Sequence, residues 1–244
     1  VVKAAPDGYT LFVGGSNMLA SAYTRPIGIN PLNDLEHVGM FCDGYMVYAT
    51  NTVIPPKNLA EFIQYAKSQP GKLNVGTPGS GGNIHVSIEM FKLRSGLNMV
   101  PIHYKSMGNV YSDLLANEIQ LAVGSFATLD AQRKAGKMRL LFVASKTRHP
   151  NFPDVPTSVE SGFADMEYVT NWYGIHAPKG TSPAIIKTLN TVVAEAAKSP
   201  ALRTRLLEGG FEPIGNTPEQ FKARIAQDYE KIGEVVKVAG VRAE

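Results

Sequence analysis

Short apolar runs alternate with amphipathic segments along most of this 244-residue chain. Between the runs, apolar side chains recur at helical spacing, as Ile84, Ile88 and Phe91 do. A chain in which strands and helices alternate favours helices packed on mostly parallel sheets. We therefore predict an α/β fold in which each sheet is mostly parallel and is flanked by helices. The predicted strands are residues 9–13, 45–49, 72–75, 98–102, 120–123 and 139–144.

Polar capping residues mark the starts of several predicted helices. Asn58 precedes an apolar stripe over residues 59–68, and Ser182 stands directly before the proline that opens a predicted helix running to about Lys198. Thr217 and Gln220 have the spacing of a capping box, which predicts a helix from residue 218 towards the end of the chain. These signals give the last third of the chain a mainly helical character.

Two extended segments, residues 43–54 and 168–178, are rich in apolar and aromatic residues and lie about one domain's length apart. Such a pair is typical of a chain that leaves one lobe and later returns to it. We therefore predict a discontinuous first lobe, residues 1–45 plus 171–244, and an inserted second lobe, residues 46–170. One continuous sheet is the alternative that the pattern leaves open.

The composition excludes several classes of function. The 24 Lys and Arg residues exceed the 21 Asp and Glu residues by only three and are scattered, so we expect no nucleic-acid partner. The apolar stretches are far shorter than the ~20 residues of a membrane span, so we expect no direct membrane insertion. The single cysteine, Cys42, excludes an intramolecular disulfide and a multi-cysteine zinc site. The five histidines do not group at ligand spacing, so we expect no metal.

A glycine-rich stretch from Val75 to His85 follows a predicted strand and opens a helix that we predict over residues 81–94. Backbone N–H groups and the helix dipole hold anions at such a point. The glycine spacing is that of a P-loop, but Gly82 and Asn83 replace the Lys and Ser/Thr that a nucleotide requires. We therefore expect no nucleotide cofactor and favour a carboxylate. A glycine-rich turn without a ligand remains the alternative.

Two further loops, Val13 to Asn17 and His103 to Asn109, also join a predicted strand to a helix. If the first belongs to one lobe and the glycine-rich loop to the other, the two loops face each other across a cleft. That cleft lies at the carboxyl ends of the strands, where open α/β sheets bind their ligands.

Enzyme motifs are mostly missing, and we predict that the protein is not an enzyme. Ser80 does not stand in a nucleophile elbow. Ser80 with His85 is nevertheless a conceivable nucleophile–base pair, which keeps a Ser/His hydrolase as a rival hypothesis. A hydrogen-bonding role of His85 in the first turn of its helix is the preferred interpretation.

Several short motifs follow one another in order along the whole chain. They are Ala4 to Leu11, Pro70 to Gly76, Tyr104-Lys105, Asp113 to Leu115, Lys134 to Arg139, Pro153 to Thr157, Trp172 to Gly174 and Ala177 to Thr181. In this series the chain resembles the periplasmic solute-binding proteins of tripartite tricarboxylate transporters, the Bug family, which includes the TctC-like proteins.

The resemblance implies a two-lobed Venus flytrap of the periplasmic-binding-protein fold, type II-like, located in the periplasm. It implies that the lobes close on a small organic carboxylate, a dicarboxylate or an aromatic carboxylate, and deliver it to membrane transporter subunits. A sensor that passes the signal to a partner kinase is the alternative. The ligand contacts implied by the resemblance are Gly15, Ser16, Asn17, Thr77, Gly79, Ser80, Gly81, His85 and Tyr104, with no cofactor and no metal.

The chain also departs from the family pattern. Many relatives have an acidic residue where this chain has Gly124 and Ser125, and its loss disfavours amino-acid ligands because their ammonium group needs an acceptor. Many relatives also have Gly in place of Ser106. Relatives begin with a further strand, loop and helix, and residues 1–5 read like the end of that helix. We expect a monomer unless the lack of that segment forces strand exchange.

Overall fold

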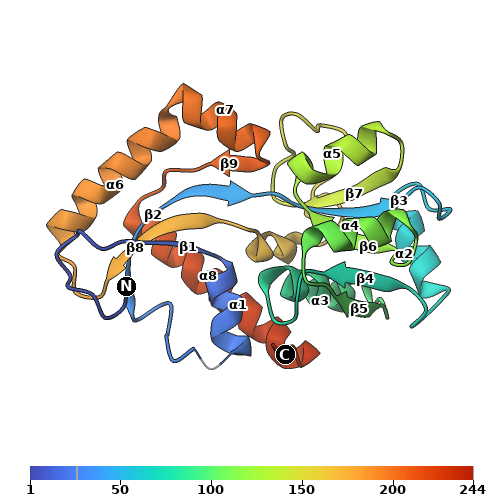
Figure 1. The fold of residues 1–244 in the computed structure, drawn as a ribbon, viewed down its shortest axis with the longest axis horizontal. Coiled ribbons are helices and arrows are strands. Elements are labelled where there is room, and N and C mark those ends of the chain that lie inside the picture. The colour runs from blue at the N-terminus through green and yellow to red at the C-terminus, as the bar shows by residue number, and fades with distance from the viewer. Residues whose placement is uncertain (26, 244) are drawn as a thin grey trace.

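Two β-sheets organise the computed structural model, which describes residues 1–25 and 27–243 (Figure 1). Figure 1 shows the two sheets in separate halves of the molecule, each with helices packed around it. The α/β class predicted from the alternating pattern is confirmed. The strands are β1 (Phe12–Gly15), β2 (Leu35–Gly44), β3 (Met46–Asn51), β4 (Asn74–Thr77), β5 (Val100–His103), β6 (Leu121–Gly124), β7 (Met138–Ala144), β8 (Tyr173–Pro178) and β9 (Phe211–Pro213). The helices are α1 (Asn17–Thr24), α2 (Leu59–Lys67), α3 (Asn83–Ser95), α4 (Met107–Leu115), α5 (Phe126–Lys134), the 3-10 helix η1 (Ala164–Val169), α6 (Pro183–Lys198), α7 (Pro200–Glu208) and α8 (Pro218–Ala239).

The strand directions differ from the prediction. The first sheet has the order β1-β8-β2-β9, and its strand pairs are antiparallel. In the second sheet, of order β5-β4-β6-β3-β7, β4 is parallel to β5 and β6, whereas β3 is antiparallel to β6 and β7. The prediction that each sheet is mostly parallel is therefore wrong. The physical reason is that the crossing segments are themselves sheet strands: the chain runs out along β2 and β3 and back along β8.

The chain passes between the two sheets twice. On the way out, β2 runs into β3 with only Tyr45 between them, so one extended stretch joins the sheets (Figure 1). On the way back, the chain leaves η1 and enters β8. The two crossings are hydrogen-bonded to each other, because Gly44 and Asn171 exchange backbone bonds at N···O distances of 3.2 and 3.4 Å.

The predicted capping residues act as expected. The side chain of Asn58 accepts a hydrogen bond from the N–H of Glu61, and α2 begins directly after it. Ser182 caps α6, and Thr217 with Gln220 forms the capping box that opens α8. Each cap satisfies an N–H that would otherwise lack a partner in the first turn. The local sequence therefore determines where these helices begin.

Two predicted boundaries are wrong. Helix α3 begins at Asn83 rather than at Gly81, because Gly81 has a φ of +74°, which a right-handed helix cannot accommodate. Residues 1–5 do not form the end of a helix. They contain a turn in which the N–H of Ala4 bonds to the carbonyl of Val1 at 2.8 Å.

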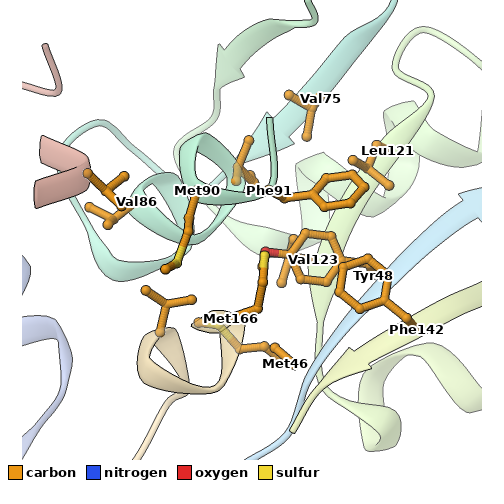
Figure 2. Packing of buried hydrophobic residues seen from close by; sticks show 14 of the residues in the cluster. Met46, Tyr48, Val75, Val86, Met90, Phe91, Leu121, Val123, Phe142 and Met166 are labelled. Carbon is orange, nitrogen blue, oxygen red and sulfur yellow. The ribbon is translucent and has the colours of Figure 1, made fainter. Parts of the chain in front are cut away.

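The largest hydrophobic core extends across both halves of the molecule. Around the second sheet, the rings of Tyr48 and Phe142 stack with their centroids 4.3 Å apart, and Phe91 packs against both (Figure 2). The same cluster continues to Leu19 on α1 and Phe221 on α8. Helices α1 and α8 accordingly contact α3, which places the starts of α1 and α3 close together (Figure 1).

Among residues 1–25 and 27–243, no helix combines the length and the apolar character that a membrane crossing requires.

Candidate ligand-binding site

Two of the predicted loops are in direct contact. The N–H of Asn83, at the start of α3, donates to Oδ1 of Asn17, at the start of α1, at 3.0 Å. The side-chain Nδ2 of Asn83 donates to Oγ of Ser16 at 3.0 Å and to the carbonyl oxygen of Thr170 at 2.7 Å. The hydroxyl of Ser16 also donates to that carbonyl, at 2.8 Å. The structure thus joins the Ser16–Asn17 loop to the glycine-rich loop through hydrogen bonds, whereas the sequence analysis expected the two loops to face each other across a cleft.

The glycine-rich loop owes its shape to two positive φ angles. Gly79 has a φ of +92° and Gly81 a φ of +74°, and glycine adopts this region at little cost. The hydroxyl of Thr77, at the end of β4, donates to the carbonyl of Gly79 at 3.1 Å. The loop therefore turns sharply between the end of β4 and the start of α3, and its backbone groups lie at the carboxyl end of β4.

The C-terminal end of the chain lies on this loop. The hydroxyl of Ser80 donates to the carbonyl of Arg242. The hydroxyl of Thr24 donates to the carbonyl of Gly81 at 2.9 Å, and the N–H of Ala243 donates to the carbonyl of Thr24 at 3.3 Å. A Cβ placed on Gly81 would lie 2.9 Å from the Cα of Ala243. The tail is thus packed so closely that only glycine fits at position 81 without movement.

His85, in the first turn of α3, is hydrogen-bonded to the glycine-rich loop. Its Nδ1 accepts a hydrogen bond from the N–H of Gly81 at 3.1 Å, so this nitrogen is unprotonated. Burial lowers the pKa of His85 to about 4, and the nearby His103 contributes in the same direction. Ser80 and His85 are each bonded elsewhere and form no nucleophile–base pair. The geometry supports the structural interpretation of His85 and not the hydrolase.

Tyr104 is bonded to the glycine-rich loop only through its backbone, because its N–H donates to the carbonyl of Thr77 at 2.9 Å. The hydroxyl of Tyr104 donates to Oδ2 of Asp113 on α4 at 2.7 Å, and its pKa is raised to about 12 by burial and by this carboxylate. Gly15 ends β1 and pairs with Tyr173. The predicted residues therefore lie around the starts of α1 and α3, with Tyr104 joined to Thr77 through its backbone and Gly15 held in the first sheet.

A cavity of about 190 Å³ lies beside these loops, where α3, α4 and α5 begin. Ile84 from the first turn of α3, Met107 from the start of α4 and Ser125, the N-cap of α5, all line it. The residues that join the two sheets, Gly44 and Tyr45 among them, close its other side. None of the sequence-predicted contacts lines this cavity. The sequence does contain a signal for this cavity: three predicted strands of one sheet are each followed by a helix, so their carboxyl ends meet at the same side of the sheet.

A second cavity, of about 220 Å³, shares Gly44 and Tyr45 with the first and has a different character. It is lined by charged residues, among them Arg224 on α8. The Nε of Arg224 donates to both carboxylate oxygens of Asp228, at 2.7 and 2.9 Å, and its Nη1 donates to Asp43 at 3.3 Å. The sequence analysis missed this network because its members are up to 185 positions apart in the chain, from residue 43 to residue 228.

Groups of three or more His, Cys, Asp or Glu side chains with the placement of a metal site do not occur in the described part of the chain.

Two α/β halves, joined by a pair of crossings and with helices that begin where the halves meet, define the architecture of a periplasmic binding protein. Solved structures with this fold superimpose closely. R. palustris Rpa4515 with adipate gives a TM-score of 0.83 at 28% identity and covers 99% of this chain and 81% of that one. MatC (Rpa3494) from Rhodopseudomonas palustris with bound malate gives 0.78 at 26% identity, with 97% and 82% covered.

The family model described as tripartite tricarboxylate transporter family receptor, TctC, matches residues 1–241, so this chain belongs to that family. It is 32% identical to the Protein BugT of Bordetella pertussis over 245 aligned residues, which cover 98% of this chain and 74% of BugT. These relatives are periplasmic solute-binding proteins and not enzymes, which confirms the family and the non-catalytic class expected from the motifs. The Ser/His hydrolase is thereby rejected.

Proposed function

We propose that this chain captures a small organic carboxylate, a dicarboxylate or an aromatic carboxylate, in the periplasm and delivers it to the membrane subunits of a tripartite tricarboxylate transporter. The observation that supports this most is the cavity at which α3, α4 and α5 begin. Helix N-termini favour negative charge through their free N–H groups and their dipoles. The cavity is smaller than the ~300–1,000 Å³ of sites for drug-sized ligands, which favours a small acid. Solved relatives with adipate and malate support the same chemistry.

In this proposal, residues 1–45 with 171–244 form the first lobe, residues 46–170 form the second, and the two crossings act as the hinge. The hydrogen bonds from Asn83 to Ser16 and Asn17 then belong to the closed arrangement, since they join the lobes directly. The protein acts as a monomer. The ligand contacts proposed from the resemblance are Gly15, Ser16, Asn17, Thr77, Gly79, Ser80, Gly81, His85 and Tyr104. The cavity lining is proposed in addition, because none of those residues lines the cavity in this arrangement.

A thermal-shift and calorimetric screen tests the binding function. Adipate, malate and benzoate are added to the full chain at increasing concentration. A ligand present at 100 times its Kd stabilises the folded state by about 2.7 kcal/mol, which is easily measured as a rise in Tm. The proposal expects such a rise with at least one acid and none with an uncharged amide such as benzamide. If no carboxylate raises the Tm, the binding function is wrong.

Asn83→Ala tests the closed arrangement. This change removes the side-chain bonds to Ser16 and Thr170, and Asn109→Ala in the exposed first turn of α4 is the matched control. We expect Asn83→Ala to increase the radius of gyration in small-angle scattering without ligand, and the control to leave it unchanged. Identical scattering of both variants and the unmodified chain would show that these bonds do not hold two moving lobes together.

Reconstituted transport tests the partner. Vesicles that contain the membrane subunits should accumulate the labelled acid only when the binding protein is present. Tight binding without any uptake would contradict the transport role and would favour the sensor hypothesis.

A further inference from the structure

The walls of the 190 Å³ cavity are mostly apolar. Met46 and Val123 contribute from the second sheet, Ile84 and Met107 from the starts of α3 and α4, and Phe211 from β9. These side chains come from both sheets and from two helices, so more than one wall of the cavity is apolar. A ligand inside this cavity therefore gains from burial to the extent that its own surface is apolar.

Three hydroxyl side chains of the cavity lie together, apart from Asn171, which lies beside Gly44, and Tyr45, whose hydroxyl donates to Glu212. The hydroxyl oxygens of Tyr111 and Thr128 lie 3.0 Å apart, and those of Ser125 and Thr128 lie 3.2 Å apart. Gly124 makes this arrangement possible, because a Cβ there would lie 2.1 Å from the Tyr111 hydroxyl. This hydroxyl cluster, Tyr111, Ser125 and Thr128, stands at the start of α5. It offers neutral hydrogen-bonding groups in a space whose other lining residues are mostly apolar.

Charge is excluded from this cavity and collected in the neighbouring one. Among the described residues that line the 190 Å³ cavity there is no Asp, Glu, Lys, Arg or His. The 220 Å³ cavity beyond Gly44 and Tyr45, in contrast, is lined by Asp43, Glu167 and Arg224, among other charged residues. An ionised group inside an apolar space without a partner is very costly. A second carboxylate or an ammonium group on the ligand would lose its hydration in this cavity without gaining a charged partner.

We infer that the preferred ligand is a monocarboxylate with an apolar body, aromatic or alkyl, whose carboxylate lies at the hydroxyl cluster. This inference rests on the proposed function and narrows it, since it selects against dicarboxylates and amino acids. Met46, Met107 and Phe211 are the residues that determine specificity, because each adds an apolar surface to the lining against which a second charged group would find no partner.

Calorimetric titration of the full chain with benzoate, hexanoate, adipate and malate tests the inference. We expect benzoate or hexanoate to bind at least tenfold more tightly than either dicarboxylate. A dicarboxylate that binds as tightly as the best monocarboxylate would overturn the inference but leave the proposed function intact. If none of the four acids binds, the result contradicts the proposed function itself.

A matched pair of substitutions locates the carboxylate. Ser125→Asp and Ser125→Asn both keep a good N-cap on α5, and only the first adds a negative charge to the hydroxyl cluster. We expect Ser125→Asp to weaken benzoate binding at least tenfold relative to Ser125→Asn. Equal affinities would show that the carboxylate does not lie at the hydroxyl cluster.

A second pair tests the apolar wall. Met107→Lys supplies a partner for a second carboxylate, whereas Met107→Leu keeps the wall apolar at similar volume. We expect the lysine variant to gain at least tenfold in affinity for adipate relative to benzoate, and the leucine variant to keep the original preference. An unchanged preference in the lysine variant would contradict the role of the wall.

Discussion

Replacing Arg224 with methionine should destabilise the protein more than the loss of a surface ion pair would. The guanidinium donates to both oxygens of Asp228, to Asp43, to the carbonyl of Glu167 and to the hydroxyl of Thr170. It thereby connects α8 to β2, to η1 and to Thr170, the residue that follows η1. Methionine keeps much of the apolar stem, so the change mainly removes the charge and its hydrogen bonds.

The size of the effect follows from the burial of Asp228. The side chain of Asp228 is 0% exposed, and among residues 1–25 and 27–243 its side-chain partners are Arg224 and Nε1 of Trp172, the latter at 2.7 Å. Removal of one partner from a buried ion pair costs about 3–5 kcal/mol, because the other charge is left without compensation. Asp228→Asn removes that charge as well and keeps an oxygen for Trp172. We therefore expect the double variant to recover about half of the loss.

Urea denaturation at pH 8, monitored by tryptophan fluorescence and circular dichroism, measures these differences. Burial raises the pKa of Asp228 to about 7, against the opposing influence of Arg224 and Trp172. Because this pKa lies above the unfolded value, the carboxyl group favours the folded state more as the pH falls through about 7 towards 4. The deficit of Arg224→Met should therefore shrink at pH 5. A loss below about 1 kcal/mol at pH 8, or a double variant less stable than the single one, would refute the reasoning.

Two further predictions concern glycine and histidine. Gly81→Ala should cost more free energy of unfolding than Gly79→Ala, because both have positive φ but only the Cβ at position 81 would meet Ala243; equal losses in urea denaturation would show that the tail moves aside. Burial lowers the pKa of His37 to about 4 and that of His176 to about 3, below their unfolded values, so stability should fall as the pH decreases below about 6.5. The slope should reach about 1.4 kcal/mol per pH unit for each ring, and His176→Gln should reduce it; an unchanged slope would contradict this assignment.

Local signals in the sequence predicted the starts of helices well. Asn58, Ser182 and Thr217 each cap a helix through an N–H three residues away, and such a contact depends only on neighbouring residues. The glycine-rich loop was predicted for the same reason, since its shape follows from its own φ angles. These elements need no information from the rest of the chain.

Strand direction and distant pairs could not be predicted in this way. An apolar run such as residues 139–144 has the same pattern whether its neighbour is parallel or antiparallel. Strand β2 was missed in the list of strands because two glycines and two acidic residues interrupt its alternation. The contact between Asn17 and Asn83, and that between Arg224 and Asp43, depend on how the two halves come together, which no local pattern contains.

The passage of the chain from one sheet to the other and back also determines the order in which the sheets can fold. All strands of the second sheet lie within residues 46–144, whereas Leu35 of β2 pairs with Pro178, 143 positions later in the chain. Contacts between such distant residues form slowly because a long loop must close first. The second sheet can therefore fold before the first sheet, which is incomplete until β8, from Tyr173 onward, has paired with β2. Pulse-labelling hydrogen exchange during refolding should find the amides of β4 and β6 protected before those of β2, and the reverse order would contradict this folding sequence.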